Sequence, residues 1–336
     1  MMKKLILFFI FLSFCFSQDI RLFGYTKGAK VIEVKLKDIR INSIENIVYS
    51  QVSTNGSIRG LHMSLLIPQT DVLKPAILYF PGGGFMSANY FKYSQMRMAL
   101  AKAGFVVASV EYRVIPDKFP ALVVDAKSAI RYLRAHAKEY GIDPMKIGVL
   151  GDSAGGYLAQ MAGVTDDKIF EQGEYLDKDS KVQAVATIYG ISNLLNIGEG
   201  FSKEVQEVHH SLAVTEALLV NGVAFRDFAG LSIQADPKKA LFASPLGHIK
   251  GKKPPFLIMH GSADTLVSPI QSKQLYEALK KEGNEAEYIL IKGANHGDIY
   301  WYQDEVINLV VKWFKKNLAS KDKKGMQNLQ NLNNNL

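Results

Sequence analysis

The strongest constraint on this chain is a short apolar run that leads into a serine flanked by glycines, Ile147-Gly-Val-Leu-Gly-Asp-Ser-Ala-Gly-Gly156. Residues 147–150 are typical of a parallel strand buried on both faces, and apolar residues at helical spacing follow from Ala154. Ser153 stands at the junction, in the pattern G-x-S-x-G, whose small residues allow a strained turn that presents the hydroxyl. Glycine-rich turns also occur for packing reasons alone, so the partners of Ser153 decide between a nucleophile and a structural turn.

Strands and helices alternate on both sides of this unit. Extended apolar segments are expected at 75–80, 104–112, 182–189, 255–260 and 286–291, and helical spacing at 96–103, 120–140, 272–281 and 304–318. Such a series predicts an α/β fold with a doubly wound, mostly parallel sheet. Three further extended segments precede it at residues 31–36, 47–52 and 61–67, with the turn signal Asn55-Gly56 between the last two. They predict an antiparallel edge with a hairpin at that turn.

An insertion interrupts the alternation between residues 191 and 253, where the chain breaks into short amphipathic pieces. It follows a central strand, and doubly wound sheets bind their ligands at the carboxyl ends of the strands. We therefore predict one domain over residues 18–319 with a lid at about 191–253.

The two ends of the chain differ from its body. Residues 1–17 begin Met-Met-Lys-Lys, continue through an apolar run and end at Ser17, which is typical of a signal peptide and short of the ~20 residues of a membrane span. We expect cleavage after Ser17, a secreted or periplasmic protein, and no stable membrane insertion. Lipidation of Cys15 is the alternative, although Phe14 is too large for the position before a lipidated cysteine. Residues 320–336, rich in Lys, Asn and Gln, predict a disordered tail.

Charge and cysteine usage exclude several classes of protein. The formal net charge of +8 comes from 40 basic and 32 acidic residues, and part of it lies in the two ends. The scattered remainder gives no stripe for binding nucleic acid. Cys15 is the only cysteine, so a chain cleaved after Ser17 has no thiolate nucleophile, disulfide or cysteine-based metal site.

A serine hydroxyl needs a base to accept its proton, so a histidine is expected near the same edge of the sheet. His296 follows the strand predicted at 286–291, where a loop can carry it to Ser153. His260 ends a buried strand and is interpreted as structural. The other five histidines lie in strand, helix or insertion contexts without a matching partner.

The base in turn needs an acceptor that fixes its tautomer. Asp264 lies in the loop after the strand at 255–260, and the order Ser153, Asp264, His296 is that of α/β-hydrolases. Asp298 is a rival that would have to fold back on His296, and Asp152 is expected to point elsewhere.

A tetrahedral oxyanion needs backbone amide donors. The triplet Gly82-Gly83-Gly84 after the strand at 75–80 can supply two, and Ala154 at the start of a helix a third. Phe85, Tyr90 and Phe91, which follow the triplet, either shape an acyl pocket or serve packing.

Seven motifs together resemble the α/β-hydrolase esterases, and within them the group related to hormone-sensitive lipase and to the bifunctional feruloyl and acetyl-xylan esterases. They are Pro81-Gly-Gly-Gly-Phe85, Glu111-Tyr-Arg113, Phe119-Pro-Ala121, Asp125 with 129–134, 151–156, 260–264 and Asn295-His296. The resemblance covers about residues 75–318. It implies Ser153 as nucleophile, Asp264 and His296 as its relay, and Gly83, Gly84 and Ala154 as oxyanion donors. It also implies that Arg113, Asp125 and Glu111 form a buried charge network that braces the serine turn.

One position departs from the family pattern. A histidine usually precedes the glycine triplet, whereas this chain has Pro81, which offers no side-chain hydrogen bond. We therefore expect ring rigidity and packing to hold the oxyanion loop.

The resemblance implies an exported serine carboxylesterase that acts through an acyl-enzyme on small or carbohydrate-linked esters, with no cofactor and no nucleic-acid partner. A prolyl-oligopeptidase-type peptidase shares the fold and the triad order, but residues 18–74 are too few for the propeller that such enzymes usually carry. A non-catalytic binding protein on the same fold is the third alternative, which a missing triad member would favour.

Overall fold

The computed structural model describes residues 24–54 and 56–318, in two units that divide between Asp38 and Ile39. The predicted signal peptide at 1–17, with Cys15, and the predicted tail at 320–336 lie outside the described residues. No helix within the described ranges is long and apolar enough to cross a membrane.

The strand predicted at residues 31–36 is wrong, because this segment has no regular structure. Val31, Ile32, Val34 and Leu36 are all exposed. Ile32, Val34 and Leu36 share one face of the alternation, but no strand pairs with this segment among the described residues, so that face is not buried.

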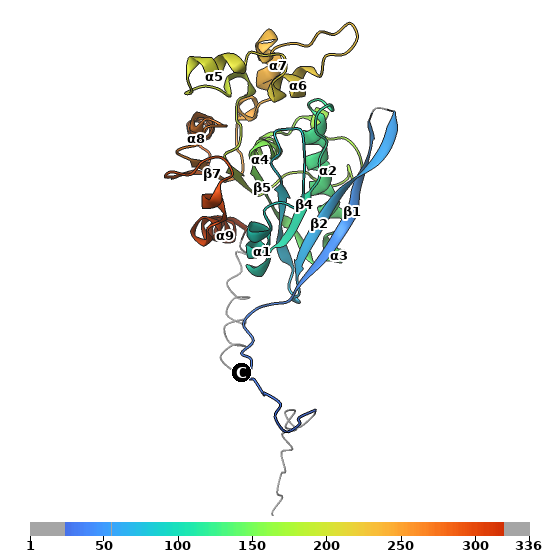
Figure 1. The fold of residues 1–336 in the computed structure, drawn as a ribbon. Coiled ribbons are helices and arrows are strands. Elements are labelled where there is room, and N and C mark those ends of the chain that lie inside the picture. Colours follow the sequence, from blue (N-terminus) through green and yellow to red (C-terminus); the bar gives the residue numbers. More distant parts are fainter. Residues whose placement is uncertain (1–23, 55, 319–336) are drawn as a thin grey trace, which may run out of the picture. The chain divides into compact units, whose positions relative to one another are not determined.

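In residues 39–54 and 56–318, eight strands form one sheet in the order β1-β2-β4-β3-β5-β6-β7-β8. The strands are β1 (Ile41–Thr54), β2 (Ser57–Pro68), β3 (Lys74–Phe80), β4 (Val106–Val110), β5 (Ile142–Asp152), β6 (Ala184–Ile188), β7 (Phe256–Gly261) and β8 (Ala286–Ile291). The pairs β1–β2 and β2–β4 are antiparallel, and the remaining neighbours are parallel. The mostly parallel sheet and the hairpin that follows β1 are confirmed (Figure 1).

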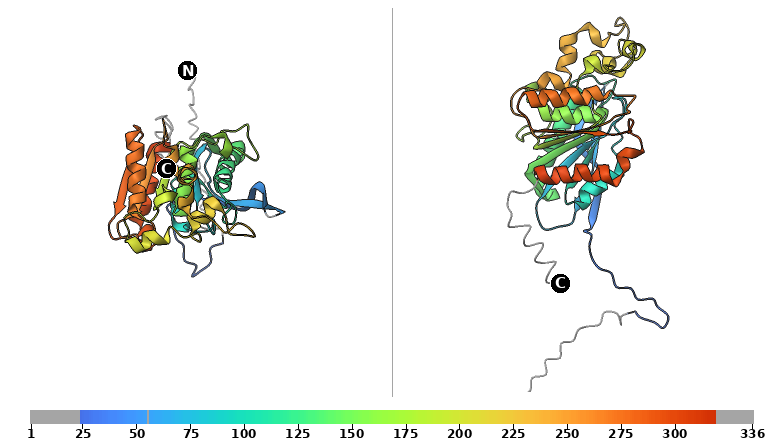
Figure 2. Two further views of the ribbon diagram at one scale, coloured as in Figure 1. Left: turned by 90° about the horizontal axis from the view of Figure 1, so that it is seen from above. Right: turned by 90° about the vertical axis from the view of Figure 1, so that its left-hand side faces the viewer.

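Helices cover both faces of the sheet (Figure 2). One face packs against α2 (Ala121–Ala135), α4 (Ala154–Val164) and α8 (Pro269–Lys281), and the other against α1 (Ser94–Lys102) and α9 (Asp304–Leu318). The short run in β5 serves both cores, since Val149 lies in the first and Leu150 in the second. This two-sided burial is why the run before Ser153 lacks polar alternation. The helix predicted at 120–140 is divided at His136, after which α3 (Ala137–Tyr140) follows.

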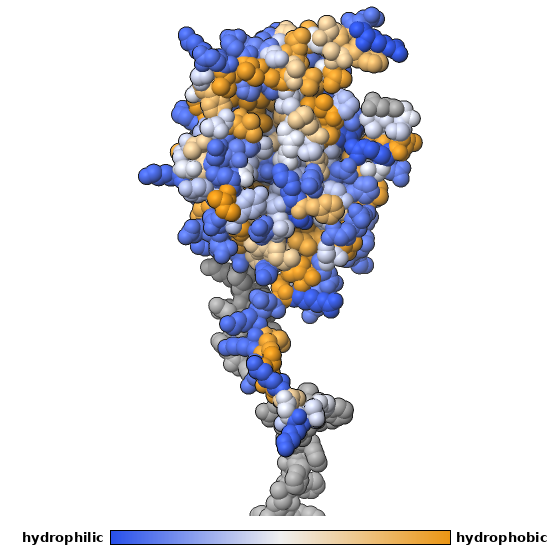
Figure 3. Space-filling model, viewed as in Figure 1, coloured by the Kyte–Doolittle hydropathy of each residue, from blue (hydrophilic) through white to orange (hydrophobic). Residues whose placement is uncertain are grey.

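The predicted insertion is a group of short helices between β6 and β7 (Figure 1). They are α5 (Lys203–Val208), α6 (Thr215–Asn221) and α7 (Pro237–Phe242), with 3-10 turns at Leu194–Asn196, Ile233–Ala235 and Pro245–His248; two more 3-10 turns lie elsewhere, at Lys168–Phe170 and Ile299–Tyr302. The insertion is attached to the domain by hydrogen bonds from the Tyr157 hydroxyl to the Ala243 carbonyl and from the Phe119 amide to the Leu219 carbonyl. It exposes several apolar side chains, Val205, Val208, Leu212, Val223, Phe225, Phe228 and Leu231, and apolar surface is visible at this end of the domain in Figure 3.

Candidate active site

Ser153 occupies a strained turn between β5 and α4, with φ 53° and ψ −122°. Such a conformation is rare for a residue with a Cβ and is tolerated only where its surroundings enforce it. A Cβ on Gly151 would lie 2.0 Å from the Gly155 carbonyl oxygen, and one on Gly155 would lie 2.0 Å from that of Phe80. The two glycines therefore allow the turn to close, and the Ser153 amide fixes it by donating to the Ile188 carbonyl at 2.9 Å.

The structure brings the three predicted relay residues together. His296 Nε2 lies 2.9 Å from Ser153 Oγ, and His296 Nδ1 lies 2.7 Å from Asp264 Oδ2. Because a carboxylate only accepts hydrogen bonds, Nδ1 carries the proton of the neutral ring and Nε2 is free to accept from the serine hydroxyl. The arrangement is that of a base positioned to take the serine proton.

Asp264 is buried at the carboxyl end of β7 and has a donor for each oxygen. Oδ1 accepts from the amides of Leu266 and Val267, both at 2.9 Å, and Oδ2 accepts from His296. Burial alone would raise the pKa of Asp264, but hydrogen bonds from His260 and His296 outweigh it and hold the pKa well below its usual range. Asp264 thus stays ionised beside the base.

His260 lies behind Asp264 and away from Ser153, fully buried. Its Nε2 is 2.9 Å from the Val267 carbonyl oxygen and 3.3 Å from Asp264 Oδ2, while Nδ1 is 2.6 Å from Ser272 Oγ. The carbonyl requires a proton on Nε2, so Nδ1 accepts from the Ser272 hydroxyl. Sequence reasoning assigned His260 a structural place but missed its contact with Asp264.

The two rival carboxylates bind elsewhere. Asp298 accepts from the amides of Asn295, at 2.6 Å, and Tyr300, at 3.1 Å, so it caps its own loop. Asp152 accepts from the Tyr79 hydroxyl at 2.7 Å and from the Gly82 amide at 2.9 Å.

The loop that carries His296 is anchored through Asn295. The Asn295 Oδ1 atom accepts from the amides of His296, at 2.7 Å, and Thr265, at 3.1 Å, and so joins the histidine loop to the aspartate loop. Trp301 Nε1 donates to the Asn295 carbonyl at 2.7 Å. These bonds fix the separation between His296 and Asp264.

The predicted oxyanion donors lie on the turn after β3 and at the start of α4. Within residues 24–54 and 56–318, no acceptor faces the amides of Gly83, Gly84 and Ala154. The first amides of a helix have no partner within the helix, which leaves the Ala154 amide available to an anion. The Gly82 amide is occupied by Asp152, so it is not a donor.

The expectation that ring rigidity and packing hold the oxyanion loop is incomplete, because the side chains of Tyr112, Asp152 and Lys92 also bind its backbone. The Tyr112 hydroxyl donates to the Pro81 carbonyl at 2.5 Å, and Asp152 holds the Gly82 amide. Lys92 Nζ donates to the Gly82 carbonyl at 3.1 Å and lies 3.8 Å from Asp152 Oδ2. No pattern in the sequence predicts the role of Lys92, because its proximity to Gly82 depends on the path of the loop.

The predicted charge network is two separate clusters. Arg113 forms a bidentate pair with buried Asp125, with Nη2 to Oδ1 at 2.7 Å, which joins the segment after β4 to α2. Burial, which dominates, raises the pKa of Asp125 although Arg113 opposes the shift. Glu111 instead binds Arg59 Nη1 at 2.7 Å and the His62 amide at 3.0 Å, both on β2. Neither cluster contacts the serine turn directly.

The aromatic residues after the glycine triplet separate into two roles. Phe85 is buried and packs edge-on against Tyr157, with ring centroids 5.2 Å apart, so it belongs to the core. Tyr90 and Phe91 stack on one another at 4.4 Å, and Phe91 is exposed.

Comparison with known proteins places this site in a family, since a model of the BD-FAE family matches residues 63–279. The chain belongs to the BD-FAE family. The match includes Ser153 and Asp264 and ends before His296. The chain has the α/β-hydrolase fold. Its mostly parallel sheet with flanking helices matches that of the esterases among its structural neighbours.

Curated relatives and solved structures are esterases by name. Esterase LipC of Mycobacterium tuberculosis is 29% identical over 66% of this chain and 53% of its own length, and the isoprenylcysteine alpha-carbonyl methylesterase of Arabidopsis thaliana is 26% identical over 76% and 56%. The chain thus spans about half the length of the curated relatives it matches. A truncated carbohydrate esterase from gut microbiota superposes with a TM-score of 0.70 at 25% identity, covering 85% of this chain and 99% of that one. A butyrate-bound esterase from Thermogutta terrifontis has a TM-score of 0.63 at 28% identity, with 85% and 97% covered.

Proposed function

We propose that this BD-FAE family member is a serine carboxylesterase. The observation that carries the proposal is the continuous hydrogen-bonded series from Ser153 through His296 to Asp264, at 2.9 Å and 2.7 Å. It begins at a strained turn that the predicted oxyanion loop approaches closely, since a Cβ on Gly82 would lie 2.9 Å from Ser153 Cβ. A base-activated hydroxyl next to an anion site is the arrangement that acyl transfer needs.

The reaction has two halves. Ser153 Oγ attacks the ester carbonyl carbon while its proton passes to His296 Nε2, and the amides stabilise the oxyanion that forms. The intermediate collapses as the carbon–oxygen bond to the alcohol breaks, and His296 returns its proton to the departing alcohol. Water then attacks the acyl-enzyme, His296 takes and returns a proton in the same way, and the carboxylic acid leaves Ser153.

The relatives support an ester substrate, since those named above are esterases, and one structure of the Thermogutta terrifontis enzyme is phosphonylated by cyclosarin. Labelling with a fluorophosphonate probe and turnover of p-nitrophenyl acetate test the proposal. We expect labelled wild-type protein and loss of both signals in Ser153→Ala, with both retained in Ser211→Ala, an exposed serine of the insertion. Undiminished turnover in Ser153→Ala, or hydrolysis of peptide anilides in preference to esters, contradicts it.

We also propose that the acyl group is small or linked to a carbohydrate. The support is the carbohydrate esterase and the bifunctional glycoside hydrolase–esterase among the structural neighbours. A panel of acetyl, butyryl, octanoyl and feruloyl esters, each with a sugar and a simple alcohol, measures this preference. Highest kcat/KM on octanoyl esters of simple alcohols would contradict it.

Export is a further part of the proposal and is supported by the composition of residues 1–17. N-terminal sequencing of protein recovered outside the cytoplasm should give a start at Gln18. A start at Cys15, or recovery of the uncleaved chain, contradicts export by this route.

A further inference from the structure

Tyr189 lies at the carboxyl end of β6 in a conformation that its residue type disfavours, with φ 39°. Its amide donates to the Met259 carbonyl at 2.7 Å, and the preceding carbonyl, of Ile188, accepts from the Ser153 amide at 2.9 Å. The strained residue is therefore fixed on both sides, next to the strained serine. Strain of this kind persists only where the surrounding structure enforces it, and it is concentrated at functional sites.

The Tyr189 side chain is placed against the base. Its ring centroid lies 4.4 Å from that of His296 at an interplanar angle of 49°, and 4.7 Å from that of Trp301 at 78°. Trp301 is fully buried and Tyr189 is 4% exposed, so the tyrosine ring is held between the tryptophan and the imidazole with little access for water. The Tyr189 hydroxyl is not among the buried side-chain atoms without a hydrogen-bond partner in the described part of the chain, and a Cβ on Gly297, next to His296, would lie 4.0 Å from it.

An aromatic face attracts a cation within about 6 Å of the ring centroid, and more strongly where water is excluded. The His296 ring is an imidazolium while the serine proton resides on it. An interaction that strengthens only with that charge lowers the barrier without tightening ground-state binding. We infer that Tyr189 is a positioning residue whose ring orients His296 and stabilises its protonated form during acyl transfer. This inference rests on the proposed esterase function.

Other charged and titratable groups surround the same imidazole. Asp264 binds Nδ1 from the loop after β7, with His260 behind it, and Ser153 binds Nε2. Asp298, in the histidine's own loop, is bound to the amides of Asn295 and Tyr300. These groups contact the ring nitrogens or lie one residue away, whereas the Tyr189 ring packs on the imidazole at a tilt, with centroids 4.4 Å apart.

Three variants isolate this effect. Tyr189→Phe keeps the ring, and Tyr189→Leu keeps the apolar bulk and removes the π face. Tyr302→Leu is the matched control. Tyr302 lies in the 3-10 turn Ile299–Tyr302, and its ring packs on that of Tyr93 with centroids 5.2 Å apart. Each is assayed for kcat, KM and the pH profile of kcat/KM on p-nitrophenyl acetate, with folding checked by thermal unfolding.

We expect Tyr189→Phe to stay within about twofold of wild type, and Tyr189→Leu to lose about fivefold in kcat with KM little changed. Activity needs neutral His296, and an imidazolium without the π face forms less readily. The acid limb of the Tyr189→Leu profile should therefore move to lower pH, by about half a unit. Tyr302→Leu should leave the limb in place.

A Tyr189→Leu variant that is slower with an unmoved acid limb, or a Tyr189→Phe variant as slow as Tyr189→Leu, overturns the inference. If Tyr189→Leu does not fold, Tyr189→Met provides the same comparison. Failure of the proposed function has a different signature, since wild-type protein would then show no turnover that depends on Ser153.

Discussion

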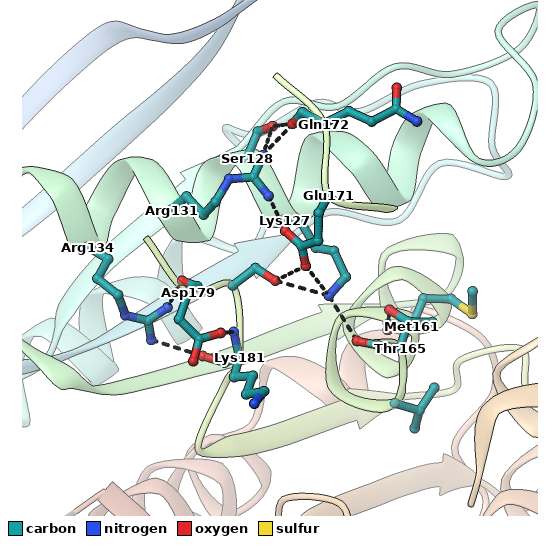
Figure 4. A network of polar contacts seen from close by, with 12 residues as sticks. Lys127, Ser128, Arg131, Arg134, Met161, Thr165, Glu171, Gln172, Asp179 and Lys181 are labelled. Carbon is teal, nitrogen blue, oxygen red and sulfur yellow. Dashed lines mark hydrogen bonds and ion pairs between the residues drawn. The ribbon is translucent and has the colours of Figure 1, made fainter. Parts of the chain in front are cut away.

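Two of the buried polar clusters in this domain show how a catalytic cluster differs from a structural one. At the carboxyl edge of the sheet, Asp264 and His260 are buried and hydrogen-bonded, and the series ends on the half-buried hydroxyl of Ser153. Elsewhere in the domain, Lys127 and Arg131 of α2 are equally buried and converge on Glu171 (Figure 4). Both clusters concentrate charge in the interior, yet only one leads to a reactive atom.

The second cluster is closed. Lys127 Nζ donates to Glu171 Oε1 at 3.0 Å, to the Thr165 carbonyl at 2.9 Å and to Ser180 Oγ at 3.1 Å, which uses all three of its protons. Burial lowers the pKa of Lys127 despite the attraction of Glu171. Burial alone would raise the pKa of Glu171, but hydrogen bonds and the two cations outweigh it and lower the pKa. Such a network fastens the segment after α4 to α2.

The largest difference between the effect on activity and the effect on stability is expected from His296→Ala. Without a base, kcat should fall by about 10⁴-fold or more, because members of a relay act as a unit. The free energy of unfolding should change by no more than about 1–2 kcal/mol, since Asp264 keeps its other donors. Single-turnover assays and urea unfolding measure the two quantities. Loss of stability in proportion to the loss of activity would mean that the relay is structural.

The opposite result is expected from Glu171→Gln, which leaves two buried cations without their shared anion. We expect the free energy of unfolding to fall by about 3 kcal/mol, with kcat of the folded protein unchanged. The matched control is Glu277→Gln, which breaks the exposed pair of Glu277 and Lys273 at 2.7 Å and should cost less than about 0.5 kcal/mol. A Glu171→Gln variant that keeps its stability while losing activity would make this cluster part of the site.

The relay of Ser153, Asp264 and His296 could be predicted from the sequence, whereas the cluster around Glu171 could not. Ser153, Asp264 and His296 each follow a strand that the apolar pattern predicts, and parallel strands end at one edge of the sheet. Lys127, Arg131 and Glu171 follow no such rule, because a helix surface and a loop meet only through tertiary packing. The same limit applies to Lys92 at Gly82 and to the ring of Tyr189 on His296.

Two predictions of secondary structure failed for a related reason. The segment 31–36 shows the alternation of a strand, but a strand needs a neighbour, and the pattern carries no information about one. The helix at 120–140 was predicted as continuous, and its division at His136 accompanies stacking of that ring on Tyr132 at 4.0 Å. Long-range contacts therefore decide whether a segment with the periodicity of a strand or helix forms that element, and where the element ends.

His260 combines features of both clusters. Its ring nitrogens are held by Ser272 and the Val267 carbonyl, as in the structural cluster, and it also contacts Asp264 of the relay. His260→Leu removes a donor from the carboxylate, and we expect about a tenfold loss in kcat with KM little changed. His260→Gln, which can still donate, should recover part of the loss. The matched control is His136→Leu, which removes a ring that stacks on Tyr132 at the end of α2 and should affect stability alone. Equal kcat in His260→Leu and wild type would place His260 with the structural cluster.

The smallest expected effect is a pH dependence of stability carried by Asp264. Its pKa is lower in the folded protein than in the unfolded chain, so its contribution to stability is fully present above the unfolded value of about 3.9 and is lost as pH falls toward the folded value. The stability difference between wild type and Asp264→Asn should therefore shrink as pH falls between about 4 and 2. Urea unfolding across this range measures it, with Glu171→Gln as the comparison in the closed cluster. Because Glu171 also has a lowered pKa, its variant should show the same sign of change. A difference for Asp264→Asn that grows in acid would mean that the folded protein holds this carboxyl protonated, which is incompatible with its role beside an imidazolium.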